Sequence, residues 1–255
     1  MILRRLSTAL QKQDWITVLI EMLIVMFGVL IGLQVNNWNE SRKDRDAGRF
    51  YLAQIAEDIA SDAAFLETNT LNLHREAEHA RIIDRYLRGE ETGLSDWDMF
   101  QIIYYRAGWT PFSPNRVTYD ELVNTGQFRL LGEAALRMDF GNYYAGLNDF
   151  APFYDFKSPL REMVRGKYTP EAQAYMWQNC FPDAHYRSGH GSFTNCPALE
   201  DADNIKQTLA ALQQDEALLE TVRYVHSIRL IVMGGSKTDI ERARTLSSQI
   251  EDFLK

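Results

Sequence analysis

The residues best suited to do chemistry are two cysteines and two histidines in one irregular stretch, at Cys180, His185, His190 and Cys196. Thiolates and imidazoles can bind tetrahedral zinc, but the common zinc frameworks place their paired ligands closer together around a tight turn. In an oxidising compartment the two thiols more simply form a disulfide, which contributes roughly 3 kcal/mol for a loop of this size. The spacing therefore favours a Cys180–Cys196 disulfide over a metal site, with free cysteines as a further alternative.

A carboxylate, Glu21, lies inside the apolar stretch 15–35, WITVLIEMLIVMFGVLIGLQV. A helix of this length spans roughly 30 Å, the thickness of the hydrocarbon core of a bilayer. Trp15 and Trp38 flank the stretch as interfacial aromatic residues do. A signal peptide would need a small-residue cleavage site, which the following residues lack, and a soluble-core helix is seldom apolar on all sides. The stretch therefore predicts an uncleaved transmembrane helix.

Small residues share one face of that helix with the carboxylate. At 100° per residue the helix aligns a stripe of six positions: Glu21, Val25, Gly28, Gly32, Val35 and Asn39. Two glycines four residues apart let helix backbones approach each other, and a carboxylate in lipid favours a partner or protonation. We expect this stripe to contact a second copy of the chain or another inner-membrane protein.

Other chemical motifs are absent or incomplete. The run GGSKT at 234–238 lacks the order of a phosphate-binding loop, and no nucleophile elbow, zinc-protease or dinucleotide motif occurs. Aromatic residues are dense between Tyr104 and Tyr154, where core packing is favoured and a ligand groove is the alternative. We therefore expect no enzyme activity and no cofactor.

The elements that position these residues follow a helical period throughout. Residues 39–87 contain no proline and carry apolar residues at steps of three, four and seven, which predicts a long helix ending near Gly89. Beyond it we expect an all-α fold, with helix starts at the capping boxes Thr118-x-x-Glu121 and Thr238-x-x-Glu241 and a turn at Gly234-Gly235. The helices predicted after residue 90 are 97–107, 118–125, 132–150, 158–167, 203–212, 215–232 and 238–254, with a loop at 168–201.

Charge and composition exclude several classes of protein. The chain of 255 residues has a net charge of −8, which is unsuited to general nucleic-acid binding. Its residues are 45% hydrophobic and 24% charged. These fractions are typical of a globular protein rather than a disordered one. Partners are therefore expected to be the lipid bilayer and other proteins.

Two blocks of sequence resemble a known family. Residues 28–40, GVLIGLQVNNWNE, after the start MILRR, resemble the signature of a functionally uncharacterised family of bacterial single-pass membrane proteins. Residues 118–131, TYDELVNTGQFRLL, followed by Tyr143-Tyr144, are similar to a second stretch of that family. The resemblance implies a cytoplasmic tail, one membrane helix and a helical extracytoplasmic domain, and it brings no catalytic residue. The stripe around Glu21 also resembles the small subunits of proton-driven bacterial motor complexes, whose acidic residue is usually aspartate.

A short basic tail before an apolar run is typical of a signal anchor, although lysines and arginines are balanced on its two sides. We expect a protein of the bacterial inner membrane with residues 1–14 in the cytoplasm, 15–35 in the membrane, a stalk helix at 36–89 and a periplasmic domain at 90–255. The predicted function is an oligomeric binding or assembly component of an envelope complex. The alternatives are a periplasmic ligand-sensing module and an accessory subunit of a proton-coupled membrane complex.

Overall fold

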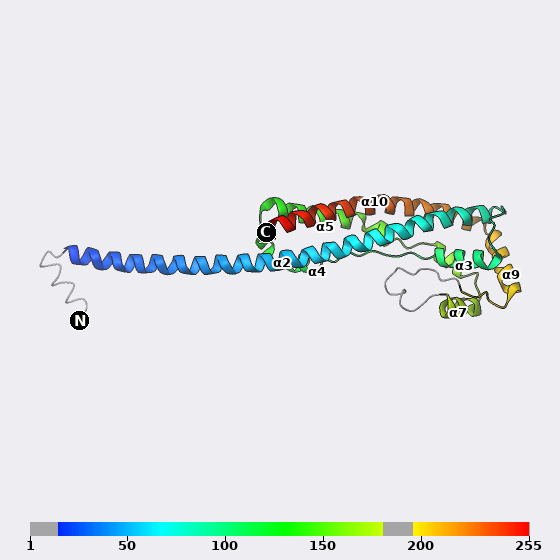
Figure 1. The fold of residues 1–255 in the computed structure, drawn as a ribbon, viewed down its shortest axis with the longest axis horizontal. Helices are drawn as coiled ribbons and strands as arrows, with labels where there is room; N and C mark the ends of the chain where they lie inside the picture. The colour runs from blue at the N-terminus through cyan, green and yellow to red at the C-terminus, as the bar shows by residue number, and fades with distance from the viewer. Residues whose placement is uncertain (1–14, 181–195, 255) are drawn as a thin grey trace.

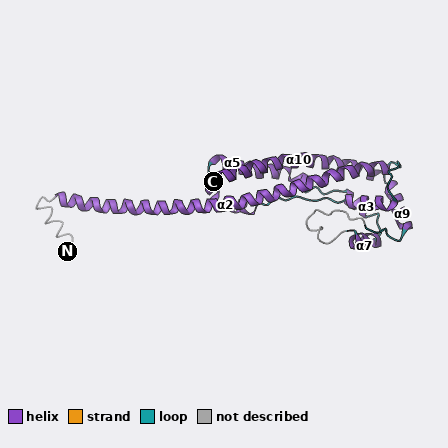
Figure 2. Cartoon of the chain, viewed as in Figure 1, coloured by secondary structure: helices purple, strands orange, loops and turns teal. Residues whose placement is uncertain are grey.

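The computed structural model describes residues 15–180 and 196–254 (Figure 1). Within these ranges the chain forms helices joined by loops and has no strand, which confirms the all-α prediction (Figure 2). The helices are α2 (Trp15–Leu87), α3 (Asp96–Arg106), α4 (Val117–Asn124), the 3-10 helix η1 (Gln127–Leu130), α5 (Ala134–Tyr154), α6 (Leu160–Arg165), α7 (Pro170–Asn179), α9 (Ala202–Gln213) and α10 (Glu216–Leu254).

Helix α2 is one unbroken helix that extends well beyond the remainder of the fold (Figure 1). The apolar stretch therefore continues directly into the long helix that the sequence predicts for residues 39–87. Gly48 is its first buried residue. A Cβ there would meet the carbonyl oxygen of Leu130, so the absence of a side chain lets the two backbones approach each other. The helix ends just before Gly89, whose φ of 77° favours glycine. The segment predicted as a stalk thus divides into an exposed neck, 36–47, and a packed portion from Gly48 onward.

Helix α10 runs antiparallel to the packed portion of α2. Arg223 binds Asp84 at the far end, and the Arg49 side chain donates to the carbonyl of Leu254 at the near end, with N···O distances of 2.6 and 2.5 Å. The chain therefore returns to the point where α2 enters the fold, and its described end lies there (Figure 1).

The predicted turn at Gly234-Gly235 is wrong, because α10 passes through both glycines. A Cβ at Gly235 would collide with the ring of Phe150 on α5, so this glycine admits an aromatic ring against the helix backbone. The predicted capping box at Thr238 is also wrong. The Thr238 hydroxyl lies within the helix and donates to the carbonyl of Gly234 at 3.4 Å.

The predicted loop at 168–201 is wrong for its first part, where α7 forms. Thr169 caps this helix by accepting a hydrogen bond from the Ala172 backbone at 3.3 Å. Pro170 occupies the first helical turn, where a proline costs the helix no hydrogen bond. Pro170 therefore lies in the first turn of a helix rather than in a loop. Residues 181–195 of the same predicted loop, with His185 and His190, lie outside the described residues.

The packed portion of α2 contributes to two apolar clusters. One lies near the end of α2, around Ile83 and Leu87, and includes residues of α3, α6, α7, α9 and the start of α10. The other includes Leu52 to Leu73 of α2 together with residues of α4, α5 and the rest of α10. Charged side chains lie between the two clusters, while Trp109 and Phe156 pack against both.

Candidate functional site

The apolar portion of α2 contacts no other described part of the chain. All six stripe positions are exposed, and an ideal Cβ at Gly28 or Gly32 meets nothing within 4 Å. Trp15 and Trp38 are each 63% exposed. By length and composition α2 is long and apolar enough to cross a membrane. The stripe predicted from the sequence is therefore continuous and available on the helix surface.

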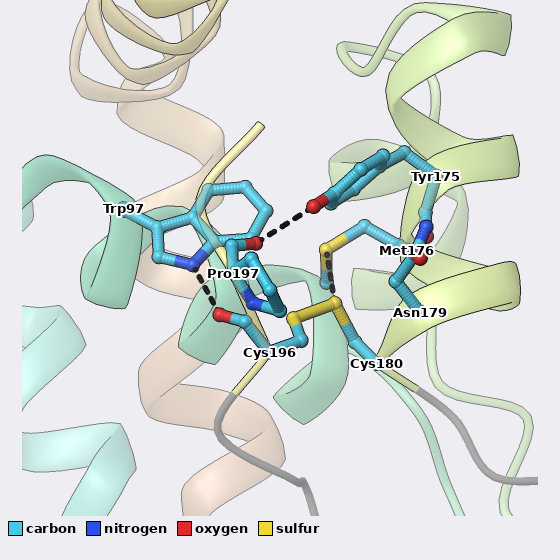
Figure 3. Close-up of a disulfide and its surroundings, with 7 residues drawn as sticks. All are labelled: Trp97, Tyr175, Met176, Asn179, Cys180, Cys196 and Pro197. Carbon is cyan, nitrogen blue, oxygen red and sulfur yellow. Dashed lines mark hydrogen bonds between the residues drawn. A yellow bond between two sulfur atoms is a disulfide. The ribbon is translucent and has the colours of Figure 1, made fainter. Parts of the chain in front are cut away.

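The predicted disulfide between Cys180 and Cys196 is present, and it joins the end of α7 to the segment that leads into α9 (Figure 3). Both cysteines are buried in the apolar cluster near the end of α2. Trp97 donates to the carbonyl of Cys196 at 3.2 Å, and the Tyr175 hydroxyl donates to that of Pro197 at 2.9 Å. Because both sulfur atoms are in the disulfide, neither cysteine can supply a thiolate ligand to zinc. Among the described residues, no group of three His, Cys, Asp or Glu side chains could hold a metal ion.

The charged layer between the apolar clusters is built around Arg229, which is only 1% exposed. Its Nε donates to Glu76 at 2.8 Å, and its Nη2 donates to the carbonyl of Arg106 at 2.6 Å, at the end of α3. The Arg106 side chain also approaches Glu76, at 3.5 Å, and donates from Nε to Nδ1 of His79 at 2.7 Å. Burial, and then the charge of Arg106, lower the pKa of His79 to about 4. His79 therefore acts as a neutral acceptor at pH 7.

A second polar cluster joins α4 to α2 and corrects the predicted capping box at Thr118. The Thr118 hydroxyl donates to Asp58 at 2.8 Å, and Glu121 accepts from the Tyr51 hydroxyl at 3.4 Å. No side chain caps α4, because both members of the predicted box bind α2 instead.

Beside that junction, Asp62 accepts the backbone N–H of Asn115 at 3.0 Å. Burial raises the pKa of Asp62 to about 6; the Asn115 hydrogen bond opposes that rise, and the nearby charge of Asp58 adds to it. An acidic pair therefore holds the loop before α4 against the long helix.

The aromatic region from Tyr104 to Tyr154 is mostly protein interior. Phe140, Tyr144 and Tyr154 are at most 2% exposed, and the rings of Tyr119 and Tyr144 lie 4.2 Å apart. The aromatic rings pack against one another and against α2, as favoured from the sequence.

Sequence reasoning did not identify Glu76, Arg106 and Arg229 as a buried ion-pair cluster. One signal was available for Arg229, which follows Val222 and Val225 on the same apolar face of α10 and precedes Val232. An arginine on such a face requires a buried acceptor. Its partners come from residues far away in the sequence, so the pattern of α10 alone does not identify them.

These elements can be compared with known proteins. The model of a family of unknown function, DUF6090, matches residues 21–158. The match runs from Glu21 through the apolar stretch, the packed part of α2 and both sequence blocks quoted above, and ends after α5. No curated protein and no solved structure matches the chain. Because the family model covers more than half of the chain, this protein belongs to the family of unknown function DUF6090.

Proposed function

We propose that this chain is a single-pass protein of the bacterial inner membrane whose helical domain lies in the periplasm and acts as an assembly component of an envelope complex. The observation that carries the proposal is the uncovered apolar portion of α2, which none of the described residues buries. Apolar surface of this extent is stable when lipid or another protein covers it. The disulfide supports a domain outside the cytoplasm, since disulfides persist in oxidising compartments.

Assembly through the stripe follows from the glycines. Dispersion contacts between closely packed backbones drive helix association in lipid, and Gly28 and Gly32 leave space for such contacts. Glu21 lies on the same face, where a neutral carboxyl can donate a hydrogen bond to a partner helix. The stripe continues through Val35 to Asn39, so the same pairing extends beyond the bilayer into the neck. A small-molecule sensor in the aromatic region is not favoured, because those rings fill the core.

A membrane two-hybrid assay tests assembly in the native bilayer. Gly28→Leu and Gly32→Leu should weaken association, because each adds a side chain at the closest approach. Leu30→Phe adds bulk on the opposite face and is the matched control, expected to leave association unchanged. Glu21→Gln should preserve association if the carboxyl acts as a neutral hydrogen-bonding group. Unchanged association in both glycine variants would show that the stripe is not the interface.

Topology is tested separately. A periplasm-active reporter fused after Lys255 should be active, and thiol labelling of the unreduced, denatured protein should modify neither cysteine. A reporter active only in the cytoplasm would overturn the periplasmic location.

A further inference from the structure

A basic groove lies where α10 begins to pack on the far end of α2. Its volume is about 260 Å³. Ala80, Arg81, Asp84, Arg85 and Arg88 of α2 line one side, and Val222, Arg223 and His226 of α10 line the other. Four arginines thus line one groove, three from α2 and Arg223 from α10, in a chain whose net charge is −8.

The acidic residues at the groove hold the arginines in place and leave a positive excess. Asp84 accepts from Nε of Arg88 at 3.0 Å and from Nε of Arg223 at 2.6 Å. Glu90 pairs with Arg85 and Arg88 at the rim. Four guanidinium groups against these two carboxylates leave two positive charges unbalanced. The ion pairs fix the guanidinium groups of Arg85, Arg88 and Arg223 before any ligand arrives, which reduces the entropy that binding must offset at these three residues.

Two groups are available for a ligand. Arg81 is exposed and makes no ion pair with any described residue. Nδ1 of His226 is buried and has no hydrogen-bond partner among the described residues. Buried polar atoms usually have a partner, and among the side chains that line this groove only this ring nitrogen is buried without one.

Three other surface grooves differ in charge. One is lined by Glu133 and Asp139, and another by Glu67, Arg244 and Glu251, so both carry excess negative charge. The groove beside Gly48 combines three arginines with two aspartates, and its Arg129 is already paired with Asp44. The groove at Arg81 therefore has the largest positive excess of the four.

We propose that the groove between α2 and α10 binds a small phosphate-bearing anion. Guanidinium groups form two parallel hydrogen bonds to phosphate oxygens, and several converging arginines match a tetrahedral oxyanion. The volume is below that of a pocket for a drug-sized ligand, so it fits a phosphate with at most a small attached group. Arg81 and the terminal nitrogens of Arg223 would bind the oxygens, and His226 would contribute one ring nitrogen.

The groove lies far along α2 from the proposed membrane span. Arg81 and Val35 belong to one continuous helix, with Arg81 far beyond the apolar stretch. At the rise of an α-helix, their separation along the chain corresponds to about 70 Å. Headgroups of the bilayer that α2 would cross are therefore out of reach. A free phosphate compound is the source that fits this distance.

Calorimetric titration of inorganic phosphate into the full chain, held in zwitterionic nanodiscs at low salt, tests the proposal. Saturable binding is expected, and Arg81→Gln should weaken it about tenfold, the loss of roughly one charge-assisted hydrogen bond. Arg223→Gln should weaken it at least as much. Arg244→Gln, on α10 in an acidic groove, is the matched control and should change affinity less than about twofold.

The location of binding has its own readout. Phosphate should shift the side-chain nitrogen resonances of His226 in the wild type and not in Arg81→Gln. Circular dichroism identifies a variant that has unfolded, and Arg81→Gln removes no ion pair between described residues, so it should retain the fold. Absence of saturation at about 10 mM phosphate, or equal weakening by Arg244→Gln, would overturn the proposal. Binding to added vesicles of anionic phospholipid without binding to phosphate would overturn it as well.

Discussion

The two portions of α2 belong to one helix and differ in what surrounds them. Residues 15–47 are almost entirely exposed, whereas from Gly48 onward an apolar residue is buried at nearly every turn up to Leu87. Both portions form their backbone hydrogen bonds within the helix, so the backbone conformation is the same in the exposed and the packed portion. The difference lies in the side chains: the packed portion has one apolar and one polar face, whereas residues 15–35 are apolar on nearly all sides and the neck is mostly polar. One unbroken helix therefore has one portion that the fold buries and one that it leaves uncovered, and variants of the two portions should have different consequences.

The largest expected effect is on the charged layer of the packed portion. Arg229→Met should lower the free energy of unfolding by about 3 kcal/mol, because Glu76 and the carbonyl at the end of α3 lose their buried partner. Arg244→Met, on the same pair of helices, removes an exposed ion pair with Glu67 and should cost under about 1 kcal/mol. Urea denaturation of the full chain in detergent, followed by circular dichroism, measures both. Equal losses would contradict the structural weight given to this layer.

A smaller effect is expected for Asp62→Asn. The difference in free energy of unfolding between this variant and the wild type should change by about 2 kcal/mol between pH 4 and pH 7. The pKa of Asp62 is about 6 in the folded protein against 3.8 for the unperturbed group, so the folded state binds the proton more tightly. The stabilising contribution of Asp62 is present below pH 4 and is lost as the pH rises through 6.

Asp62→Asn removes this dependence. Its stability relative to the wild type should therefore rise between pH 4 and pH 7, and then remain level. Measuring the free energy of unfolding of both proteins across this pH range gives the difference directly. His79, whose lowered pKa makes stability rise with pH, is present in both proteins, so its contribution cancels. A constant difference between the two proteins would contradict the proton linkage.

The smallest effect compares two adjacent glycines of α10. A Cβ at Gly235 must displace the Phe150 ring, whereas a Cβ at Gly234 meets nothing within 4 Å. Gly235→Ala should therefore destabilise the fold by about 1 kcal/mol or slightly more, the cost of overpacking. Gly234→Ala should stabilise the helix by about 0.5–1 kcal/mol, because alanine favours the helical backbone. Thermal unfolding of the two variants checks the opposite signs, and stabilisation by both changes would show that the ring is not held against the helix.

Local sequence was sufficient for several features. The apolar stretch of α2 and the helical period of the following residues are properties of neighbouring residues. The helix predicted at 118–125 corresponds to α4, which ends just before Gly126, where φ is 70°. Because the chain has two cysteines, only one intramolecular disulfide is possible, and the structure contains it.

Tertiary contacts decided the remainder, because each local preference is worth about 1 kcal/mol and a buried contact can exceed it. Gly234-Gly235 indicated a turn, yet the Phe150 ring and the packing of α10 on α2 keep the helix continuous. Thr118 indicated a cap, yet its hydroxyl binds Asp58. Arg229 and the groove beside Arg81 bring together residues more than a hundred positions apart, so their partners exist only once α10 lies antiparallel to α2.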